Sequence, residues 1–285
     1  MKNRRRKSNS PKKSKRKEGS EPFKKKDRAK NTVSQDYSVS EKIRINKFIA
    51  HAGLCSRREA DRLIEEGKVT VNGKVISELG MKVSQKDEIV VDGQTLSLEP
   101  FVYLLLNKSK NTITTTDDEK GRNTVMDEVE TATGYRVYPV GRLDRNTTGL
   151  LILTNDGDLA HRLMHPSYKV KKTYEVTTDR TLTDNELSAF MKGVELEDGV
   201  AKGHNVKRFA DVKNTFLISV FEGRNRLIRR MVEFHEAEVT KLKRTEYAGL
   251  NLKEVGNGRW RYLKQDEINN LRKLVKLDAL DFKKG

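Results

Sequence analysis

The order of short apolar segments after Pro100 constrains the fold of this chain more than any other feature of its sequence. Segments rich in β-branched and aromatic residues outnumber those with helical spacing, and the strand–helix–strand alternation of a doubly wound sheet is absent. We therefore expect an α+β domain over residues 100–275, built on a mixed, mostly antiparallel sheet. The expected strands cover 101–106, 135–140, 149–154, 171–177, 204–209, 215–220, 239–247 and 261–263. The expected helices cover 158–164, 183–192, 225–235 and 266–274, and residues 276–285 remain as a C-terminal tail.

A smaller unit precedes this domain, over residues 41–99. Apolar residues at helical spacing predict two helices, and residues 56–59 read Ser-Arg-Arg-Glu, a capping box that begins the second helix. Asn-Gly at 72–73 favours a hairpin turn between short strands, because this pair tolerates positive φ. Both helices carry basic side chains opposite the apolar stripe, as a solvated or a polyanion-binding helix would. They are Arg44, Lys47, Arg57, Arg58 and Arg62.

The first forty residues carry most of the positive charge of the chain. They hold 15 Lys/Arg against 4 Asp/Glu, which is +11 of the total net charge of +17. With so few apolar side chains, this segment cannot bury enough surface to offset the entropy of ordering. We therefore expect residues 1–40 to be a disordered basic tail. Such a tail can bind RNA phosphates without sequence preference, act as a nuclear localisation signal, or simply solubilise the chain.

The sequence disfavours a disulfide-bonded, a zinc-binding and a membrane-spanning protein. Cys55 is the single cysteine, so no internal disulfide can form, and a reducing, cytoplasmic location is expected. His161 and His165 are four residues apart but lack the acid between them that a zinc-binding helix of the His-Glu-x-x-His type carries, so we expect no metal site. No secretory signal is evident, and no apolar segment approaches the roughly 20 residues that span a bilayer, so no membrane partner is expected.

One polar loop between two apolar stretches, within residues 140–157, concentrates charge. Asp144 has Arg142 and Arg145 as close neighbours in sequence. Nearby guanidinium groups favour the ionised form of a carboxylate, which is the form a carboxylate nucleophile needs. A surface turn with solvated ion pairs explains this segment alone equally well.

Two further motifs accompany this loop. Residues 141–150 read Gly-Arg-Leu-Asp-Arg-Asn-Thr-Thr-Gly-Leu, 171–176 read Lys-Lys-Thr-Tyr-Glu-Val, and 221–231 read Phe-Glu-Gly-Arg-Asn-Arg-Leu-Ile-Arg-Arg-Met. In order and spacing they resemble the motifs of the RsuA/RluB family of ribosomal RNA pseudouridine synthases. The segments 48–60 and 67–73 resemble the RNA-binding domain named after the fourth protein of the small ribosomal subunit, which the same family carries. The resemblance covers residues 42 to about 275; one departure is Ser109, where the family usually has proline after the lysine at 108.

The resemblance implies a reaction and its residues. The bond from ribose to the uracil nitrogen breaks and is remade to carbon-5, which implies neither a metal nor another cofactor. Asp144 matches the nucleophile, which attacks either the anomeric carbon of the sugar or the uracil ring. Tyr174 matches the tyrosine that stacks on the extruded uracil; without the motif, it would be an ordinary sheet tyrosine. Arg229 matches the arginine that pairs with the aspartate, by a bidentate contact. The arginines at 224–230 also fit the exposed basic face of a helix whose other face places Phe234 in the core.

The remaining predictions concern binding. We expect substrate contacts from Arg142, Arg145 and Arg224 around the pocket and from Lys47, Arg57, Arg58 and Arg62 on the small unit. The expected partner is ribosomal RNA, with large-subunit RNA favoured, and the expected state is a monomer. One alternative is a non-catalytic RNA-binding or ribosome-assembly protein that retains the fold. Another is a two-carboxylate hydrolase that uses Asp144 with Asp156 or Asp158, although these two acids suit the start of a helix better.

Overall fold

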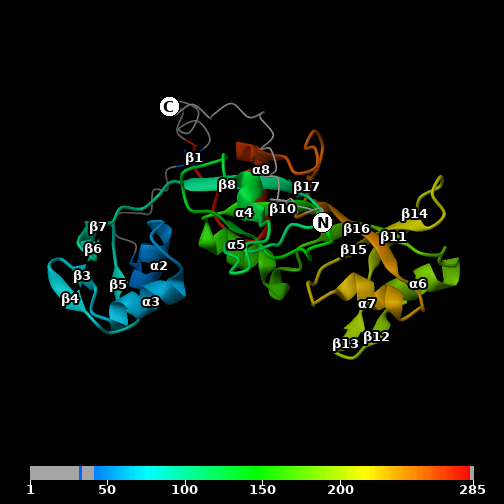
Figure 1. Cartoon of the computed structure of the whole chain (residues 1–285), viewed down its shortest axis with the longest axis horizontal. Coiled ribbons are helices and arrows are strands. Elements are labelled where there is room, and N and C mark those ends of the chain that lie inside the picture. The colour runs from blue at the N-terminus through cyan, green and yellow to red at the C-terminus, as the bar shows by residue number, and fades with distance from the viewer. Residues whose placement is uncertain (1–31, 34–41, 283–285) are drawn as a thin grey trace, which may run out of the picture.

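The computed structural model describes residues 32–33 and 42–282. A small unit at one end is followed by a long sheet that carries helices on its faces (Figure 1). This agrees with the predicted α+β class. Within the described residues, no helix is long and apolar enough to cross a membrane.

The small unit consists of two helices and short antiparallel strands. α2 (Ile45–His51) packs against α3 (Arg57–Glu65), and the chain then forms a four-stranded sheet in the order β4-β3-β6-β7. Fully buried Ile45, Ile64 and Ile89 lie in its core. Its strands are β2 (Ile43–Arg44), β3 (Val69–Val71), β4 (Lys74–Ile76), β5 (Lys82–Val83), β6 (Ile89–Val91) and β7 (Gln94–Thr95).

Local signals in this unit were mostly sufficient to place its elements. Asn72 and Gly73 form the hairpin turn with φ of 50° and 76°, as predicted. Ser56 caps α3 by accepting a hydrogen bond of 3.2 Å from the Glu59 amide. The Glu59 carboxylate, however, forms an ion pair with Arg62 rather than the predicted return bond to the Ser56 amide. Only half of the capping box is therefore confirmed.

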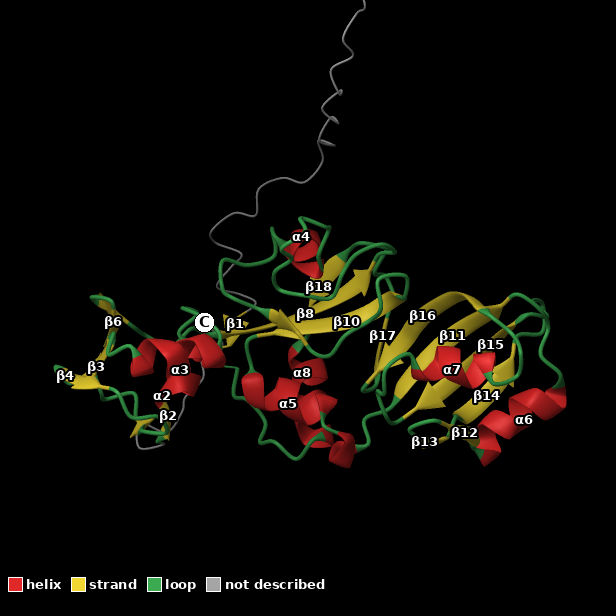
Figure 2. Ribbon diagram, turned by 60° about the horizontal axis from the view of Figure 1, so that its bottom comes forward, coloured by secondary structure: helices red, strands yellow, loops and turns green. Residues whose placement is uncertain are grey.

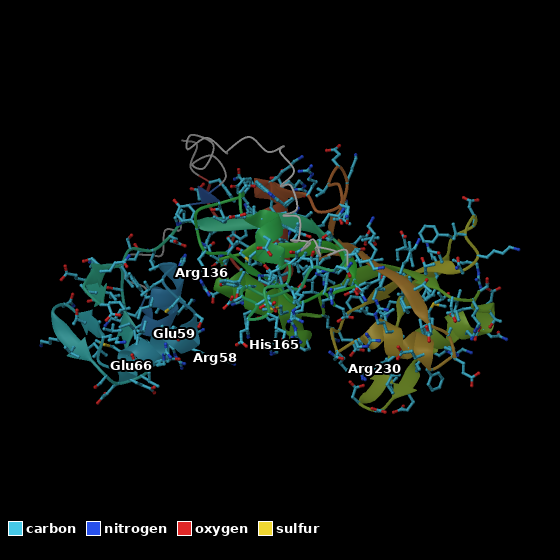
Figure 3. The ribbon with its side chains drawn as sticks, viewed as in Figure 1. Arg58, Glu59, Glu66, Arg136, His165 and Arg230 are labelled. Atoms are coloured by element: carbon cyan, nitrogen blue, oxygen red, sulfur yellow. The ribbon has the colours of Figure 1, made fainter. Side chains whose placement is uncertain are left out.

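Two side-chain pairs are among the contacts between the small unit and the large one. The ring of His51 stacks on that of Phe101, with centroids 4.8 Å apart. Burial lowers the pKa of His51 to about 4, so the stacked ring is neutral at physiological pH. Lys47 also reaches across, and its Nζ lies 2.7 Å from a carboxylate oxygen of Asp158. These contacts place the basic helices beside the large unit, on one side of it (Figure 3).

The large unit is built on a ten-stranded sheet with the path β1-β8-β10-β16-β11-β15-β14. Strands β10 and β16 pair in parallel, and the other described neighbours in this sheet are antiparallel, which confirms the predicted mixed, mostly antiparallel sheet. The strands are β8 (Phe101–Lys108), β9 (Tyr138–Pro139), β10 (Thr148–Thr154), β11 (Lys172–Thr178), β14 (His204–Arg208), β15 (Thr215–Val220), β16 (Val239–Tyr247), β17 (Leu250–Asn251) and β18 (Trp260–Tyr262). A separate hairpin pairs β12 (Val194–Leu196) with β13 (Gly199–Ala201).

Helices cover both halves of this sheet, and the parallel β10–β16 pair joins the halves (Figure 2). In the first half, α5 and α8 share one apolar core with one face of β8 and β10, and α4 shares a second core with the other face. In the second half, α6 and α7 pack with β11, β15 and β16. The helices are α4 (Val125–Val129), α5 (Gly157–Met164), α6 (Asp184–Lys192), α7 (Leu227–Glu233) and α8 (Gln265–Leu274), with a 3₁₀ turn at η2 (Pro166–Tyr168).

Three predictions about single elements were wrong. The strand expected at 135–140 is reduced to Tyr138–Pro139, since proline lacks the amide that a longer ladder would use. The helix expected from residue 225 begins at Leu227, because Arg226 adopts a left-handed conformation with φ of 47°. Phe234, expected in the core, is 55% exposed because it follows the last residue of α7.

The two predicted tails also differ from expectation. Thr32 and Val33 form β1 (Thr32–Val33), which pairs with the edge of β8. The prediction of disorder is therefore wrong for these two β-branched residues; residues 1–31 and 34–41 lie outside the described part of the chain. At the other end, Leu277, Leu280 and Phe282 pack against the core around α8, so the large unit continues beyond residue 275.

Candidate active site

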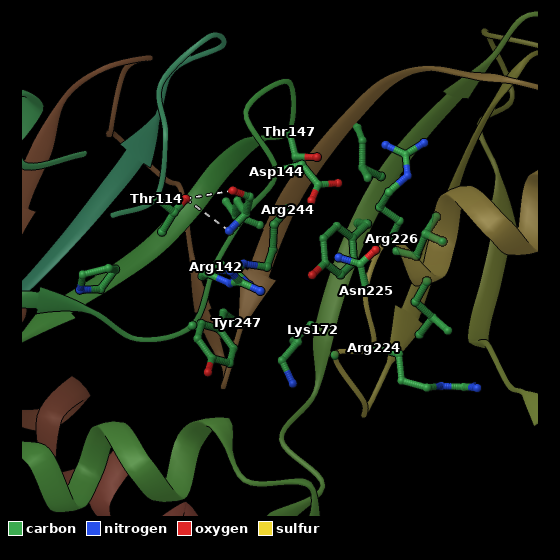
Figure 4. A pocket seen from close by; sticks show the side chains of 18 of the residues that line it. Thr114, Arg142, Asp144, Thr147, Lys172, Arg224, Asn225, Arg226, Arg244 and Tyr247 are labelled. Carbon is green, nitrogen blue, oxygen red and sulfur yellow. Dashed lines mark hydrogen bonds between the residues drawn. The ribbon is translucent and has the colours of Figure 1, made fainter. Parts of the chain in front are cut away.

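The loop that carries Asp144 connects β9 to β10 and is held from two sides. Thr114 accepts a hydrogen bond of 3.2 Å from the Leu143 amide and donates one of 2.8 Å to the Leu143 carbonyl (Figure 4). The Thr147 amide donates to the Asp144 carbonyl at 3.0 Å and closes the turn. Leu143 and Thr147 are buried, whereas the Asp144 side chain is 40% exposed. The loop thus presents its carboxylate to the pocket from a fixed backbone.

Lys108 also holds this loop, through hydrogen bonds to its backbone. Its side chain is fully buried at the end of β8, and its Nζ donates to three carbonyl oxygens, those of Ser109 and Thr147 at 2.9 Å and that of Arg145 at 3.3 Å. Burial lowers the pKa of Lys108 to about 8, although the nearby Glu128 and Asp144 carboxylates oppose the shift. In the sequence, Lys108 stands out only as the residue before the departure at Ser109.

Arg229 approaches Asp144 from the first turn of α7. Its Nε lies 3.7 Å from the Asp144 Oδ2, an ion pair longer than a hydrogen bond, and its Nη1 donates to the Val239 carbonyl at 3.0 Å. The predicted bidentate contact is absent, because that carbonyl occupies one arm of the guanidinium fork. Burial lowers the pKa of Arg229, but a guanidinium remains a cation at any physiological pH.

Tyr174 lies on β11, in register with Ile218 on one side and Arg244 on the other. Its half-buried side chain packs against both neighbouring cores and lines the same pocket as Asp144. The pocket has a volume of about 810 Å³. Asp144 and Tyr174 therefore line one pocket, and Arg229 lies next to Asp144 without being one of the lining residues.

Two buried cations in this pocket were missed by the sequence analysis. Lys172 is 9% exposed and Arg244 is 2% exposed, and both lie beside the ring of Tyr247 (Figure 4). Arg244 comes close to β10 because its partner in the ladder is Gly149; a Cβ there would lie 2.3 Å from the Arg244 carbonyl oxygen. The doubled lysine at 171–172 was the one local signal, but it does not tell which lysine turns inward.

The other arginines predicted around the pocket differ in whether a protein carboxylate already pairs with them. Arg142 and Arg145 line it from exposed positions. Arg224 also lines it, but its guanidinium is held by Glu222 at 2.6 Å and by Asp198 at 2.8 Å. Arg230 contacts the same Asp198. Arg224 thus ties the β12–β13 hairpin to the loop before α7.

The basic residues predicted on the small unit are placed on its helices. Lys47 is paired with Asp158, and Arg62 is paired with Glu59 and Glu66. Arg57 reaches Asn46, and Arg58 is exposed (Figure 3). All of these side chains are at least partly accessible to a polyanion.

The two-carboxylate hydrolase is not supported by the geometry. Asp156 is buried, caps α5 through the Leu159 amide, and pairs with Arg272 at 2.7 Å. Asp158 is held by Lys47, and neither acid lines the pocket of Asp144. His161 and His165 lie side by side, but the described residues contain no group of metal-binding side chains.

The comparisons with known proteins agree with this arrangement. A family model described as RNA pseudouridylate synthase matches residues 102–234, and an S4 domain model matches residues 43–89. The chain is 45% identical over 236 residues to the ribosomal large subunit pseudouridine synthase B of Bacillus subtilis (strain 168), covering 81% of this chain and 96% of that protein. It is 38% identical over 244 residues to the dual-specificity RNA pseudouridine synthase RluF of Escherichia coli (strain K12), covering 85% and 82%.

The fold is also shared with a solved structure. A crystal structure of a pseudouridylate synthase matches with a TM-score of 0.57 and 26% identity, over 80% of this chain and 99% of that one. Fold and site thus define an RNA-modifying isomerase with an appended RNA-binding domain. The chain belongs to the RNA pseudouridine synthase family, as its motifs predicted.

Proposed function

We propose that this protein converts a specific uridine of large-subunit ribosomal RNA to pseudouridine, with Asp144 as the nucleophile. The single observation that carries this proposal is the Asp144 carboxylate, which is presented to a pocket lined by Tyr174 and lies 3.7 Å from Arg229. The Bacillus subtilis relative is named for the large ribosomal subunit, which supports the choice of RNA.

The pocket residues divide the reaction between them. The Asp144 carboxylate captures the nucleotide while the bond between the sugar and the uracil N1 breaks, and release follows once the sugar is joined to C5. The C5 proton leaves and N1 gains one, so the product is an isomer and no redox partner is consumed. Arg229 stabilises the charged carboxylate, and Tyr174 presents a ring on which the base stacks.

The basic residues outside the pocket supply affinity for RNA. A uridine in structured RNA must be turned out of its stack, which costs a few kcal/mol. Contacts of Lys47, Arg57, Arg58 and Arg62 with phosphates offset this cost without reading sequence. The non-catalytic alternative keeps such contacts but has no need of the ion pair between Asp144 and Arg229.

Substitution of the nucleophile tests the proposal. We expect Asp144→Asn to abolish pseudouridine formation while RNA affinity changes little, because the amide cannot form the covalent bond and the phosphate contacts remain. The readout is pseudouridine mapping of total RNA from cells that lack the protein and carry either variant. Asp211→Asn, on an exposed turn, is the matched control and should restore the modification. Modification restored by Asp144→Asn would exclude this nucleophile.

A further inference from the structure

We propose that Lys172 and Arg244 form a buried subsite for the phosphate group attached to the captured uridine. The inference deepens the proposed function, since the subsite lies in the pocket that Asp144 and Tyr174 line. It assigns a role to two cations that the chemistry at Asp144 leaves unexplained.

The sheet itself creates the subsite. In the ladder between β11 and β16, Lys172 lies opposite Tyr247, and Arg244 lies opposite Tyr174. The Lys172 Nζ is 5.6 Å from the centroid of the Tyr247 ring, and the Arg244 guanidinium carbon is 4.6 Å from it. Both cations therefore lie against one aromatic ring in the pocket wall (Figure 4).

The donors of these two side chains are mostly unused. The Arg244 Nε donates to the Leu150 carbonyl at 2.7 Å, whereas its Nη2 is buried and has no hydrogen-bond partner among the described residues. The Lys172 Nζ donates to the Val170 carbonyl at 3.2 Å. Within residues 42–282, neither side chain forms an ion pair. A buried guanidinium arm without an acceptor is costly, so it calls for a ligand that supplies one.

The electrostatics of the site favour an anion. Burial lowers the pKa of Lys172 to about 8, and the nearby Arg244 cation adds to the shift. Glu222 is the carboxylate that opposes it, but Arg224 holds both of its oxygens, at 2.6 and 3.2 Å. Lys172, Arg244 and Arg224 thus face the single carboxylate of Glu222, and the local charge is net positive.

The chemistry of the two donors selects the anion. A planar guanidinium arm and an ammonium on adjacent strands, both beside one ring, suit the oxygens of a phosphate. Every nucleotide in RNA carries a phosphate on each side of its ribose, so a uridine whose base stacks on Tyr174 brings a phosphate into the same pocket. A phosphate bound at these two buried side chains belongs to an extruded nucleotide, because a nucleotide bound only by surface lysines does not reach them.

Binding of mononucleotides to the full chain tests the subsite. The probes are uridine, uridine 5′-monophosphate, uridine 3′-monophosphate and inorganic phosphate, each titrated by NMR. We expect one monophosphate to bind the wild type about tenfold to a hundredfold more tightly than uridine, as a charged hydrogen bond provides. The monophosphate that does so identifies which side of the ribose enters the subsite.

Variants assign the preference to its residues. Lys172→Met should bring the ratio of monophosphate to uridine affinity close to one while uridine affinity stays unchanged. The control is Lys171→Met, the adjacent lysine, whose exposed side chain pairs with Glu246; it should keep the wild-type ratio. Arg244→Lys keeps the charge but loses donors and should give an intermediate ratio, and it carries the test if Lys172→Met does not fold.

Three results would overturn the subsite. They are equal affinity of the wild type for uridine and both monophosphates, no binding of any nucleotide, and inorganic phosphate that binds as tightly as the nucleotides. The last would mean a free-anion site separate from substrate capture. Failure of the proposed function gives a different result. If Asp144→Asn still forms pseudouridine, the nucleophile is assigned wrongly, but the preference for monophosphates can still be measured.

Discussion

Two buried lysines in the large unit, Lys108 and Lys172, lie in opposite surroundings. In both, burial lowers the pKa to about 8. Lys108 donates to three carbonyl oxygens of the Asp144 loop and its neighbourhood, and the nearby Glu128 and Asp144 carboxylates favour its charge. Lys172 donates to one carbonyl and lies near the like charge of Arg244.

A structural cation and a binding one differ in the acceptors around them. Burial of an ammonium is costly in both places, as the lowered pKa of each lysine shows. Three carbonyl oxygens accept from Lys108, whereas one accepts from Lys172. A ligand can therefore add acceptors at Lys172, and removal of the two side chains should have different effects on stability.

The largest effect is expected at Lys108. Lys108→Met leaves three carbonyl oxygens, one buried and two partly buried, without their donor, and we expect it to destabilise the fold by about 3 kcal/mol or more. The thermal midpoint should fall by about 6–12 °C, and turnover should fall with it, because the Asp144 loop loses its anchor. Scanning calorimetry and a turnover assay measure both. Lys110→Met, two residues away and exposed, is the control. An unchanged midpoint for Lys108→Met would remove the distinction between the two lysines.

How far the sequence predicted these features depends on whether their cause is local. The β15 and β16 strands were predicted with the bounds they have, because they are rich in β-branched and aromatic residues, which favour strands. The helix expected over 183–192 is α6, and its start is local too, because Thr183 and Glu186 form a capping box within one turn. Asp144, Tyr174 and Arg229 were brought together as the motif spacing implied, and their catalytic roles stay a prediction.

Features that depend on distant contacts could not be predicted in this way. Lys108 and Thr147 meet only because β8 pairs with β10. Arg244 is buried because β16 runs beside Gly149, and nothing near residue 244 in sequence indicates this. The pairing of Arg224 with Asp198 likewise requires a hairpin about 26 residues earlier in the chain. Buried cations are therefore the part of this site that only the fold reveals.

A smaller effect of opposite sign is expected at Lys172. Lys172→Met replaces an uncompensated buried charge with an apolar side chain of similar length, and we expect it to stabilise the free protein by about 1–2 kcal/mol. The thermal midpoint should rise by about 2–8 °C. Such a gain in stability, together with the loss of the preference for monophosphates, would show that Lys172 binds the ligand and destabilises the free protein. Calorimetry on the protein without RNA decides this, with Lys171→Met as the control. A lowered midpoint would mean that Lys172 is a structural residue like Lys108.

The last effect is a pH dependence of stability to which both lysines contribute. The folded-state pKa of each is about 8, below the ordinary value of 10.5, so between these values the unfolded state binds more protons. The free energy of unfolding should therefore rise with pH across this window, by about 1–2 kcal/mol for each lysine between roughly pH 7.5 and 9.5. Above that range the pKa values of Tyr103 and Tyr247, which burial raises, act in the opposite direction. Urea unfolding at the two pH values should show about half of the wild-type rise in Lys172→Met, because Lys108 remains. A rise as large as that of the wild type would mean that burial does not lower the pKa of Lys172 in the folded protein, so that its charge does not oppose folding.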